Sequence, residues 1–154
     1  MAVDLGLGCG DRDEDLCTRL DFCAMIVEHE VHAGEAPDVS VVIVTWNTRD
    51  LLLEALRSLY AETTAVTFEV IVVDNASEDG TSAVVNHLYP DVRLIELATN
   101  RGFTGGNNVG FEVARGRHVL LLNSDTIVLQ STVEPLVRFL DEHPRAGTAG
   151  ARHL

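Results

Sequence analysis

The sequence predicts an α/β fold, in which an open and mostly parallel sheet carries helices on both faces. Short runs of β-branched and apolar residues alternate along the chain with segments of helical periodicity, and this alternation is typical of βαβ units. The strand-like runs are apolar without a period of two, which indicates strands that are covered on both faces. Together these observations favour a doubly wound, Rossmann-like sheet.

The first expected strand and helix begin this alternation. Val39–Thr45 is an almost uninterrupted β-branched run, as in a buried strand. In Arg49–Glu62, leucines at positions 52, 56 and 59 fall on one face of a helix. Asn47 precedes this helix and can cap its first turn.

Two further strands are expected before the middle of the domain. Phe68–Val73 is the second strand and leads to Asp74, and the short helix after it ends near Leu88, just before a proline. The third strand is Val92–Leu97. A glycine-rich loop then leads into a helix from about Gly106 to Arg115.

The fourth strand, His118–Leu122, stops at the polar triplet Asn123-Ser124-Asp125. Ser131 to Glu134 has the pattern of a capping box, which predicts the start of a helix that ends near His143. Another strand is approached at Gly147–Gly150. Because the chain ends as this element begins, we expect the sheet to be truncated at its C-terminal side.

The first 38 residues differ in composition from the rest. They contain ten acidic side chains and two arginines, and so carry −8 of the net charge of −13. An acidic helix can be drawn over Asp13–Val31, ended by Gly34–Pro37, and no strand is expected before Val39. We therefore divide the chain into residues 1–38, an acidic appendage or partly disordered tail, and an incomplete α/β domain over residues 39–154.

The bulk composition excludes several classes of protein. A net charge of −13 argues against a nucleic-acid partner, which would need a basic face. No run approaches the ~18–20 apolar residues of a membrane span, and no secretory signal begins the chain. We expect a cytoplasmic protein without a transmembrane segment, peripheral to a membrane only through a C-terminal part or a partner.

The cysteines have two readings. Cys9, Cys17 and Cys23 suit a reducing compartment and lack the paired spacing of metal ligands. Together with His29 and His32 they could form a zinc site, but ordinary tail residues are the favoured interpretation.

Polar residues follow each of the four expected strands. The carboxyl ends of parallel strands meet at one edge of a sheet, and ligands of open α/β proteins bind there. We therefore expect one crevice lined by four clusters, which are Thr45-Trp46-Asn47, Asp74-Asn75, Asn100-Arg101-Gly102 and Asn123-Ser124-Asp125.

The carboxylates of this edge suggest two kinds of contact. Asp74 can accept two N–H bonds from the edge of a uracil-like base, although capping of the turn at 77–81 is an equally open role. Asp125 and Asn123 offer hard oxygen ligands for Mg²⁺ or Mn²⁺, which become adequate when ligand phosphates add further oxygens. A turn cap is the alternative role for Asp125.

Anionic groups would be met by backbone and by one cation. Gly102, Gly105 and Gly106 would let the backbone approach a ligand, and helix N–H groups near Gly106 could face an anion. Arg101 is placed to meet a phosphate, with a surface arginine as the alternative.

The chain lacks the motifs of three other classes of α/β protein, which are dinucleotide-binding domains, P-loop proteins and hydrolases with a nucleophile elbow. The turn after the first strand, Thr45-Trp46-Asn47-Thr48, has no glycine of a G-x-G-x-x-G fingerprint. The chain contains no lysine, which rules out a G-x-x-x-x-G-K-[ST] loop, and no G-x-S-x-G elbow occurs. A redox or regulatory Rossmann-like domain is therefore disfavoured.

Four motifs follow one another along the chain. They are VSVVIVTWN (Val39–Asn47), VDNASEDGT (Val73–Thr81), NRGFTGGNNVG (Asn100–Gly110) and LLNSDT (Leu121–Thr126). Together they resemble the N-terminal half of family 2 glycosyltransferases with the GT-A fold. They occur in family order and span about Val39–Leu154, and the NRGF…GGNN and NSDT variants look most like rhamnosyltransferase-like members.

The resemblance implies a UDP- or dTDP-sugar donor, a saccharide or lipid-linked acceptor, and inverting transfer to an acceptor hydroxyl in polysaccharide or cell-wall biosynthesis. Asp125 would be the ligand of a divalent metal, Mg²⁺ or Mn²⁺, and of the diphosphate, with Asn123 in place of the first acid of the D-x-D motif. The implied nucleotide-sugar-binding residues are Thr45, Asn47, Asp74, Asn100, Arg101, Gly102, Asn107, Asn108 and Asn123.

The general base of the family lies after the D-x-D motif, and we expect it beyond Leu154. The catalytic base is therefore not identified within the sequence. The alternative function is a truncated nucleotide-binding module without turnover.

Overall fold

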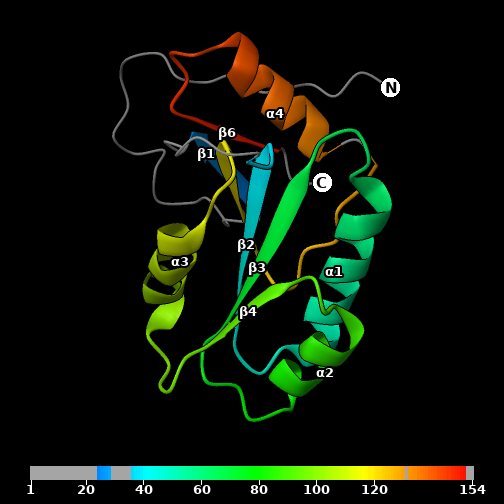
Figure 1. Ribbon diagram of the computed structural model, residues 1–154, viewed down its shortest axis with the longest axis vertical. Helices are drawn as coiled ribbons and strands as arrows, with labels where there is room; N and C mark the ends of the chain where they lie inside the picture. Colours follow the sequence, from blue (N-terminus) through cyan, green and yellow to red (C-terminus); the bar gives the residue numbers. More distant parts are fainter. Residues whose placement is uncertain (1–23, 29–35, 131, 152–154) are drawn as a thin grey trace.

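A computed structural model describes residues 24–28, 36–130 and 132–151 of the chain (Figure 1). In these residues, one sheet lies between helices on its two faces, which confirms the α/β class. The strands are β1 (Ala24–Glu28), β2 (Val39–Thr45), β3 (Phe68–Asp74), β4 (Arg93–Glu96), β5 (His118–Leu122) and β6 (Thr148–Gly150). The helices are α1 (Arg49–Glu62), α2 (Thr81–Leu88), α3 (Gly102–Val113) and α4 (Val133–Glu142).

The strand order of the sheet is β4-β3-β2-β5-β1-β6. The four strands β4, β3, β2 and β5 are parallel, whereas β1 runs antiparallel to both of its neighbours. From β2 the chain builds outward through β3 to β4, and then returns to place β5 on the other side of β2. This reversal between β2 and β5 is the switch point at which open α/β sheets bind ligands.

Strand β1 corrects two expectations from the sequence. Ala24–Glu28 pairs with β5 in the register Ala24↔Leu122 to Glu28↔His118, so a strand does precede Val39, and a helix through these residues is wrong. A short apolar run cannot be assigned to a helix or a strand by periodicity, and here the open edge of β5 provides the pairing partner. Residues 1–23 and 29–35, with the cysteines and His29 and His32, lie outside the described residues, so the appendage stays a prediction.

The core lies on both faces of the parallel strands, as the lack of alternation indicated. On one face, Val41 and Ile43 of β2 pack with the buried leucines of α1 and with α2 and α4. On the other face, Val42 of β2 and Ile71 of β3 pack against α3. Leu52, Leu56 and Leu59 are fully buried, which confirms the expected inner face of α1.

Helix α3 lies close to β2 because two glycines face the strand. A Cβ atom on Gly106 would come within 2.7 Å of Val44 Cγ1, and one on Gly110 within 2.3 Å of Val42 Cγ1. The helix begins at Gly102, earlier than the expected start near Gly106. Glycine disfavours helices in isolation, but here the missing side chains permit contact with the sheet.

The start of β5 is held by a carboxylate of β3. Glu69 accepts hydrogen bonds from the Ser40 hydroxyl at 2.6 Å and from the Arg115 N–H at 2.8 Å. Burial of Glu69 favours its neutral form, but these hydrogen bonds outweigh it and lower the pKa of Glu69. Ser40 also accepts from the Gly116 N–H at 2.7 Å, so the turn before β5 is fixed to β2.

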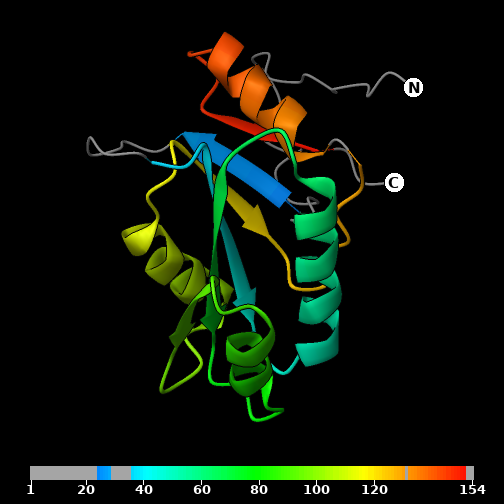
Figure 2. The same cartoon turned by 45° about the vertical axis from the view of Figure 1, so that its right-hand side comes forward.

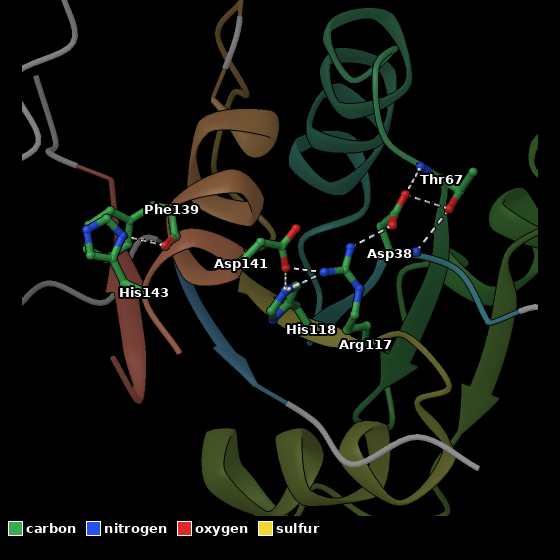
Figure 3. A network of polar contacts seen from close by, with 7 residues as sticks. All are labelled: Asp38, Thr67, Arg117, His118, Phe139, Asp141 and His143. Atoms are coloured by element: carbon green, nitrogen blue, oxygen red, sulfur yellow. Dashed lines mark hydrogen bonds and ion pairs between the residues drawn. The ribbon is translucent and has the colours of Figure 1, made fainter. Parts of the chain in front are cut away.

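A second polar network joins the amino ends of the strands to α4 (Figure 3). Arg117 donates to Asp38 Oδ1 at 2.8 Å and also pairs with Asp141, whose Oδ1 lies 2.8 Å from His118 Nε2. Asp38 accepts from the Thr67 N–H at 2.9 Å, and the hydrogen bonds from Thr67 and Arg117 lower the pKa of Asp38. This network lies at the end of the sheet opposite to the candidate site.

The Glu134 carboxylate binds a loop that is distant in the sequence. Its Oε1 atom accepts from the N–H groups of Thr64 and Ala65, at 2.9 and 3.2 Å. The cap residue of the helix is Thr132, without a hydrogen bond from its side chain to the helix. Ser131, the first residue of the expected capping box, lies outside the described residues, so the box itself stays a prediction.

We predict that Gly110→Ala destabilises the fold by about 1–3 kcal/mol, because the added methyl group overlaps Val42. Urea unfolding monitored by circular dichroism measures the change. Gly147→Ala is the control, since a Cβ there meets nothing within 4 Å. The double variant Gly110→Ala/Val42→Ala should recover part of the loss, and a stable Gly110→Ala variant would contradict the proposed close contact.

Candidate functional site

The carboxyl end of β2 points toward the lower end of the molecule in Figure 2. A cleft lies at the switch point, between the ends of β2 and β5 and the start of α3. The cleft has a volume of about 370 Å³. Loops after β2 and β5 and the first turn of α3 contribute to its wall. The lining residues are Val44, Thr48, Phe103, Asn123, Ser124 and Asp125.

The Asn123-Ser124-Asp125 triplet follows directly after β5, in which every residue is buried. The Thr126 N–H donates to the Asn123 carbonyl at 3.2 Å and closes a turn. Asn123 and Ser124 are half-buried, whereas Asp125 is exposed. The rigid strand therefore presents a solvated carboxylate at the rim of the cleft.

Three hydroxyl groups connect the end of β2 with this triplet. Thr48 donates its one hydroxyl proton to Ser124 Oγ at 3.0 Å, and so accepts from the Thr45 hydroxyl at 2.9 Å. Thr45 is fully buried, so its side chain supports Thr48 from behind. Thr48 lines the cleft, but the residues expected from the sequence to bind the ligand included Thr45 and Asn47 and omitted Thr48. The position of Thr48, directly after Asn47, could have indicated it.

Asn47 joins two loops of the site and does not cap α1. Its N–H donates to Ser77 Oγ at 2.9 Å, and its Oδ1 accepts from the Glu78 N–H at 2.8 Å. The residue has a positive φ of 54°, which asparagine tolerates better than most residues. The expectation that Asn47 caps α1 is wrong, because its side chain binds the loop after β3.

The first turn of α1 is capped from that same loop. Asp79 Oδ2 accepts from the Arg49 N–H at 3.0 Å, and its Oδ1 accepts from the N–H and hydroxyl of Thr81, at 3.1 and 2.5 Å. Burial favours the neutral form of Asp79, but these hydrogen bonds outweigh it and lower the pKa of Asp79. Asp79 therefore ties α1 to the start of α2.

Asp74 lies at the end of β3 and is 3% exposed. Its Oδ1 accepts from the Ser77 N–H at 2.9 Å, and its Oδ2 accepts from the Ser82 hydroxyl. These contacts match the turn-capping role that the sequence left open beside recognition of a base. Each carboxylate oxygen has a second lone pair, so the contacts do not exclude a ligand.

Asn75 fixes the loop that follows β4. Its amide group binds the side chain of Asn100 and the backbone of Arg101 and Gly102, at 2.8–3.2 Å. The Gly102 N–H also donates to Asn100 Oδ1 at 2.8 Å. Asn75 was part of a polar cluster in the sequence but was absent from the expected ligand-binding residues.

The expected residues of α3 separate into two groups. Gly106 and Asn107 are buried against the protein, and Gly106 packs on Val44, so packing on β2 is enough to require a glycine there. Arg101, Gly102 and Asn108 are exposed. The first N–H groups of α3 belong to residues near Gly102, because the helix begins there.

A divalent cation fits this site if a bound phosphate completes its set of ligands. Among the described residues, no three His, Cys, Asp or Glu side chains gather as a metal cage. Asp125 supplies the one carboxylate among the described residues that line the cleft. Mg²⁺ is often held by one or two carboxylates together with substrate phosphates, and Asp125 with Asn123 suits that arrangement.

The fold and site define an α/β protein with an open ligand cleft at the switch point of its parallel strands, and the comparisons with known proteins name the class. Residues 40–154 match the family described as Glycosyl transferase family 2. The chain therefore belongs to glycosyltransferase family 2.

Two relatives illustrate the relationship. The succinoglycan biosynthesis protein ExoO of Rhizobium meliloti is 39% identical over 119 residues, which cover 77% of this chain and 32% of that protein. The poly(ribitol-phosphate) beta-N-acetylglucosaminyltransferase TarS of Staphylococcus aureus is 36% identical over 110 residues, 68% of this chain and 19% of that protein. The chain thus spans a third or less of the length of these relatives.

Solved structures confirm the GT-A fold. TarS 1–349 in complex with UDP-GlcNAc matches with a TM-score of 0.62 and 32% identity, covering 70% of this chain and 32% of that chain. The mannosyltransferase PcManGT of Pyrobaculum calidifontis, in complex with GDP-Man and Mn²⁺, matches with a TM-score of 0.62 and 30% identity, covering 68% and 32%. In the part of our chain that the structure describes, no helix has both the length and the apolar character of a bilayer span.

We predict that Asp79→Ala lowers the free energy of unfolding by about 1–2 kcal/mol at pH 7, because α1 and α2 lose a shared cap. The pKa of Asp79 is lowered in the folded state, so this contribution is present above the unfolded pKa and is lost as pH falls. The difference from wild type should therefore narrow below about pH 4. Chemical denaturation at several pH values tests this, with exposed Glu78→Ala as the control; a difference independent of pH would contradict it.

Proposed function

We propose that the cleft at the switch point binds the diphosphate of a nucleotide-sugar donor, and that the chain is the donor-binding part of a glycosyltransferase. The observation that carries the proposal is the meeting of Thr48, Ser124 and Asp125 in one cleft at the carboxyl ends of β2 and β5. Hydroxyl groups and a metal-binding carboxylate suit a diphosphate. The solved relatives named for UDP-GlcNAc and for GDP-Man with Mn²⁺ support this assignment.

The nucleoside is proposed to lie along the loops after β2, β3 and β4. Asp74 would read the base, and Asn47 would border the nucleoside through the loop that it shares with Ser77 and Glu78. A uridine or thymidine nucleotide is our expectation. The full proposed set is Thr45, Asn47, Asp74, Asn100, Arg101, Gly102, Asn107, Asn108 and Asn123, to which the structure adds Thr48 as a residue of the cleft wall. Thr45 and Asn107 are buried, so we propose that these two support the site from within the protein.

A divalent metal, Mg²⁺ or Mn²⁺, would be held by Asp125 with help from Asn123. When bound, it would neutralise charge on the departing diphosphate. Asp125 is exposed and follows a buried strand, so it can bind an ion without rearrangement of the core. Thr48 orients the Ser124 hydroxyl, whose own proton is then free to be donated toward a phosphate oxygen.

The proposed reaction is an inverting transfer. An acceptor hydroxyl attacks the anomeric carbon as the bond from that carbon to the diphosphate oxygen breaks, and a general base takes the hydroxyl proton. The base is not assigned to a residue of this chain. Because the chain spans 32% of ExoO and 19% of TarS, the acceptor and the complete reaction are proposals for a longer protein.

The names of the relatives indicate a class of acceptor and leave the sugar open. ExoO is named for succinoglycan biosynthesis and TarS for poly(ribitol-phosphate), which supports a saccharide or lipid-linked acceptor in polysaccharide or cell-wall biosynthesis. A rhamnosyl donor, suggested by the motif variants, has no support from these names. Location at the cytoplasmic side, with peripheral attachment to a membrane, is part of the same proposal.

The alternative function is a nucleotide-binding module without turnover. Incubation with a radiolabelled donor and a saccharide acceptor discriminates the two: sugar transfer by the wild type that is lost in Asp125→Ala indicates an enzyme, whereas binding without transfer indicates the module.

We predict that Asp125→Asn weakens UDP binding in the presence of Mn²⁺ by at least ~10-fold, and leaves the affinity without metal nearly unchanged. The reason is that the amide retains the shape but loses the charge of the ligand. Titration calorimetry with and without Mn²⁺ measures both affinities. Asp91→Asn is the matched control, because Asp91 is exposed and precedes β4, at the amino ends of the parallel strands and away from the cleft. An unchanged response to Mn²⁺ would refute the metal-binding role of Asp125.

We predict that Asp74→Asn weakens the binding of UDP about 10-fold, but changes that of pyrophosphate by less than about twofold. Asn keeps an acceptor for the Ser77 N–H but removes one of the two acceptors available to a base. Ser82→Ala serves as the control, since it deletes the contact from α2 to Asp74 and leaves the carboxylate intact. Equal losses for the two ligands would eliminate the base-reading role.

A further inference from the structure

Asn75 is buried directly after β3, and both the nitrogen and the oxygen of its amide group form hydrogen bonds with the loop after β4. Nδ2 donates to Asn100 Oδ1 at 2.9 Å and to the Gly102 carbonyl at 3.2 Å, while Oδ1 accepts from the Arg101 N–H at 2.8 Å. The side chain is 3% exposed. An asparagine amide has two N–H donors, so both are engaged by the next loop.

The loop that Asn75 holds is a tight turn at the start of α3. Asn100 Oδ1 accepts from the Gly102 N–H at 2.8 Å, and Gly102 has a positive φ of 71°. Side chains other than glycine rarely adopt that conformation. The turn is thus specified from two sides, by the amide of Asn75 and by the backbone freedom of Gly102.

Asn75 also belongs to the strand edge on which the site is built. Its N–H donates to the Thr45 carbonyl at 2.9 Å, and the preceding residue is Asp74. One residue therefore joins the ends of β2 and β3 to the loop after β4.

The turn determines where the first residues of α3 lie. Phe103 follows Gly102 and lines the cleft. Arg101 is exposed, and its Cβ would lie 2.8 Å from a Cβ at position 105, so Gly105 leaves space beside it. A change in the turn would displace Arg101 and Phe103 together.

We propose that Asn75 is a positioning residue of the donor site, which acts through the Asn100–Gly102 turn to hold Arg101 where it meets the diphosphate. This proposal rests on the function proposed above. A buried amide with a purely structural role would contribute to stability alone. The contact of its Oδ1 with the N–H of Arg101 itself is what connects Asn75 to the ligand.

The test is a double-mutant cycle on the affinity for UDP with Mn²⁺. Titration calorimetry is performed on the wild type, Asn75→Ala, Arg101→Ala and the double variant, at a temperature where circular dichroism shows all four folded. Each single variant should bind about 10-fold more weakly. The affinity of the double variant should be within about twofold of that of Arg101→Ala, because Asn75 acts through Arg101.

The controls separate the possible failures. Asn86→Ala replaces an exposed asparagine of α2 and should leave the affinity unchanged. Asn75→Asp keeps the acceptor for the Arg101 N–H but cannot donate to Asn100; it should also bind UDP more weakly, and it replaces Asn75→Ala in the cycle if that variant does not fold.

Four results would overturn the inference. A lower melting temperature with unchanged affinity would show that Asn75 is only structural. Additive losses in the double variant, or full affinity in Arg101→Ala, would show that Asn75 does not act through Arg101. A wild-type chain that binds neither UDP nor the other nucleoside diphosphates would instead refute the proposed function, and the inference with it.

Discussion

The close contact between α3 and β2 is the constraint on which the position of the site depends. Gly106 and Gly110 face Val44 and Val42 so closely that a Cβ on either would come within 2.7 Å of the strand. Val44 is also part of the cleft wall, and α3 brings Phe103 to that wall. The distance between helix and strand therefore sets where Phe103 lies relative to Val44. Close packing of this kind resists small adjustments, so the core fixes this part of the cleft wall, and the loops after β2 and β5 complete it.

The loops at the carboxyl edge are held by polar side chains that bind one another. Asn47 and Asp79 connect the loops after β2 and β3, and Asn75 connects the latter to the loop after β4. A polar residue at a strand end can thus face the ligand or support a neighbour that does. Residues of both kinds occur close together in the sequence. The lining of the cleft separates Thr48, Ser124 and Asp125 from residues such as Thr45 and Asn75, which are buried and support the loops.

The cleft lies at the carboxyl ends of the parallel strands, whereas ion pairs stabilise the fold at the amino ends. At the amino ends, the pairs of Arg117 with Asp38 and Asp141 join β2, β5 and α4, far along the strands from the cleft (Figure 3). The pKa values of Asp38 at this end and of Asp79 at the other end are lowered in the folded protein. Both carboxylates therefore make the folded state more stable at neutral pH than at acidic pH. The ends are coupled through buried strands, which place the triplet after β5 in a fixed register with β2.

The sequence by itself determined the parallel core, the inner face of α1 and the edge at which the site lies. Those features follow from local apolar patterns, because burial on two faces leaves a signature in each strand. Tertiary structure alone decided the pairing of Ala24–Glu28 with β5, the early start of α3, and the partners of Glu134, Asn47 and Asn75. Each of these depends on a group distant in the sequence: an open strand edge, a sheet surface that accepts glycines, or a backbone N–H that needs an acceptor. The residue types show which hydrogen bonds are available, but only the folded chain selects among them.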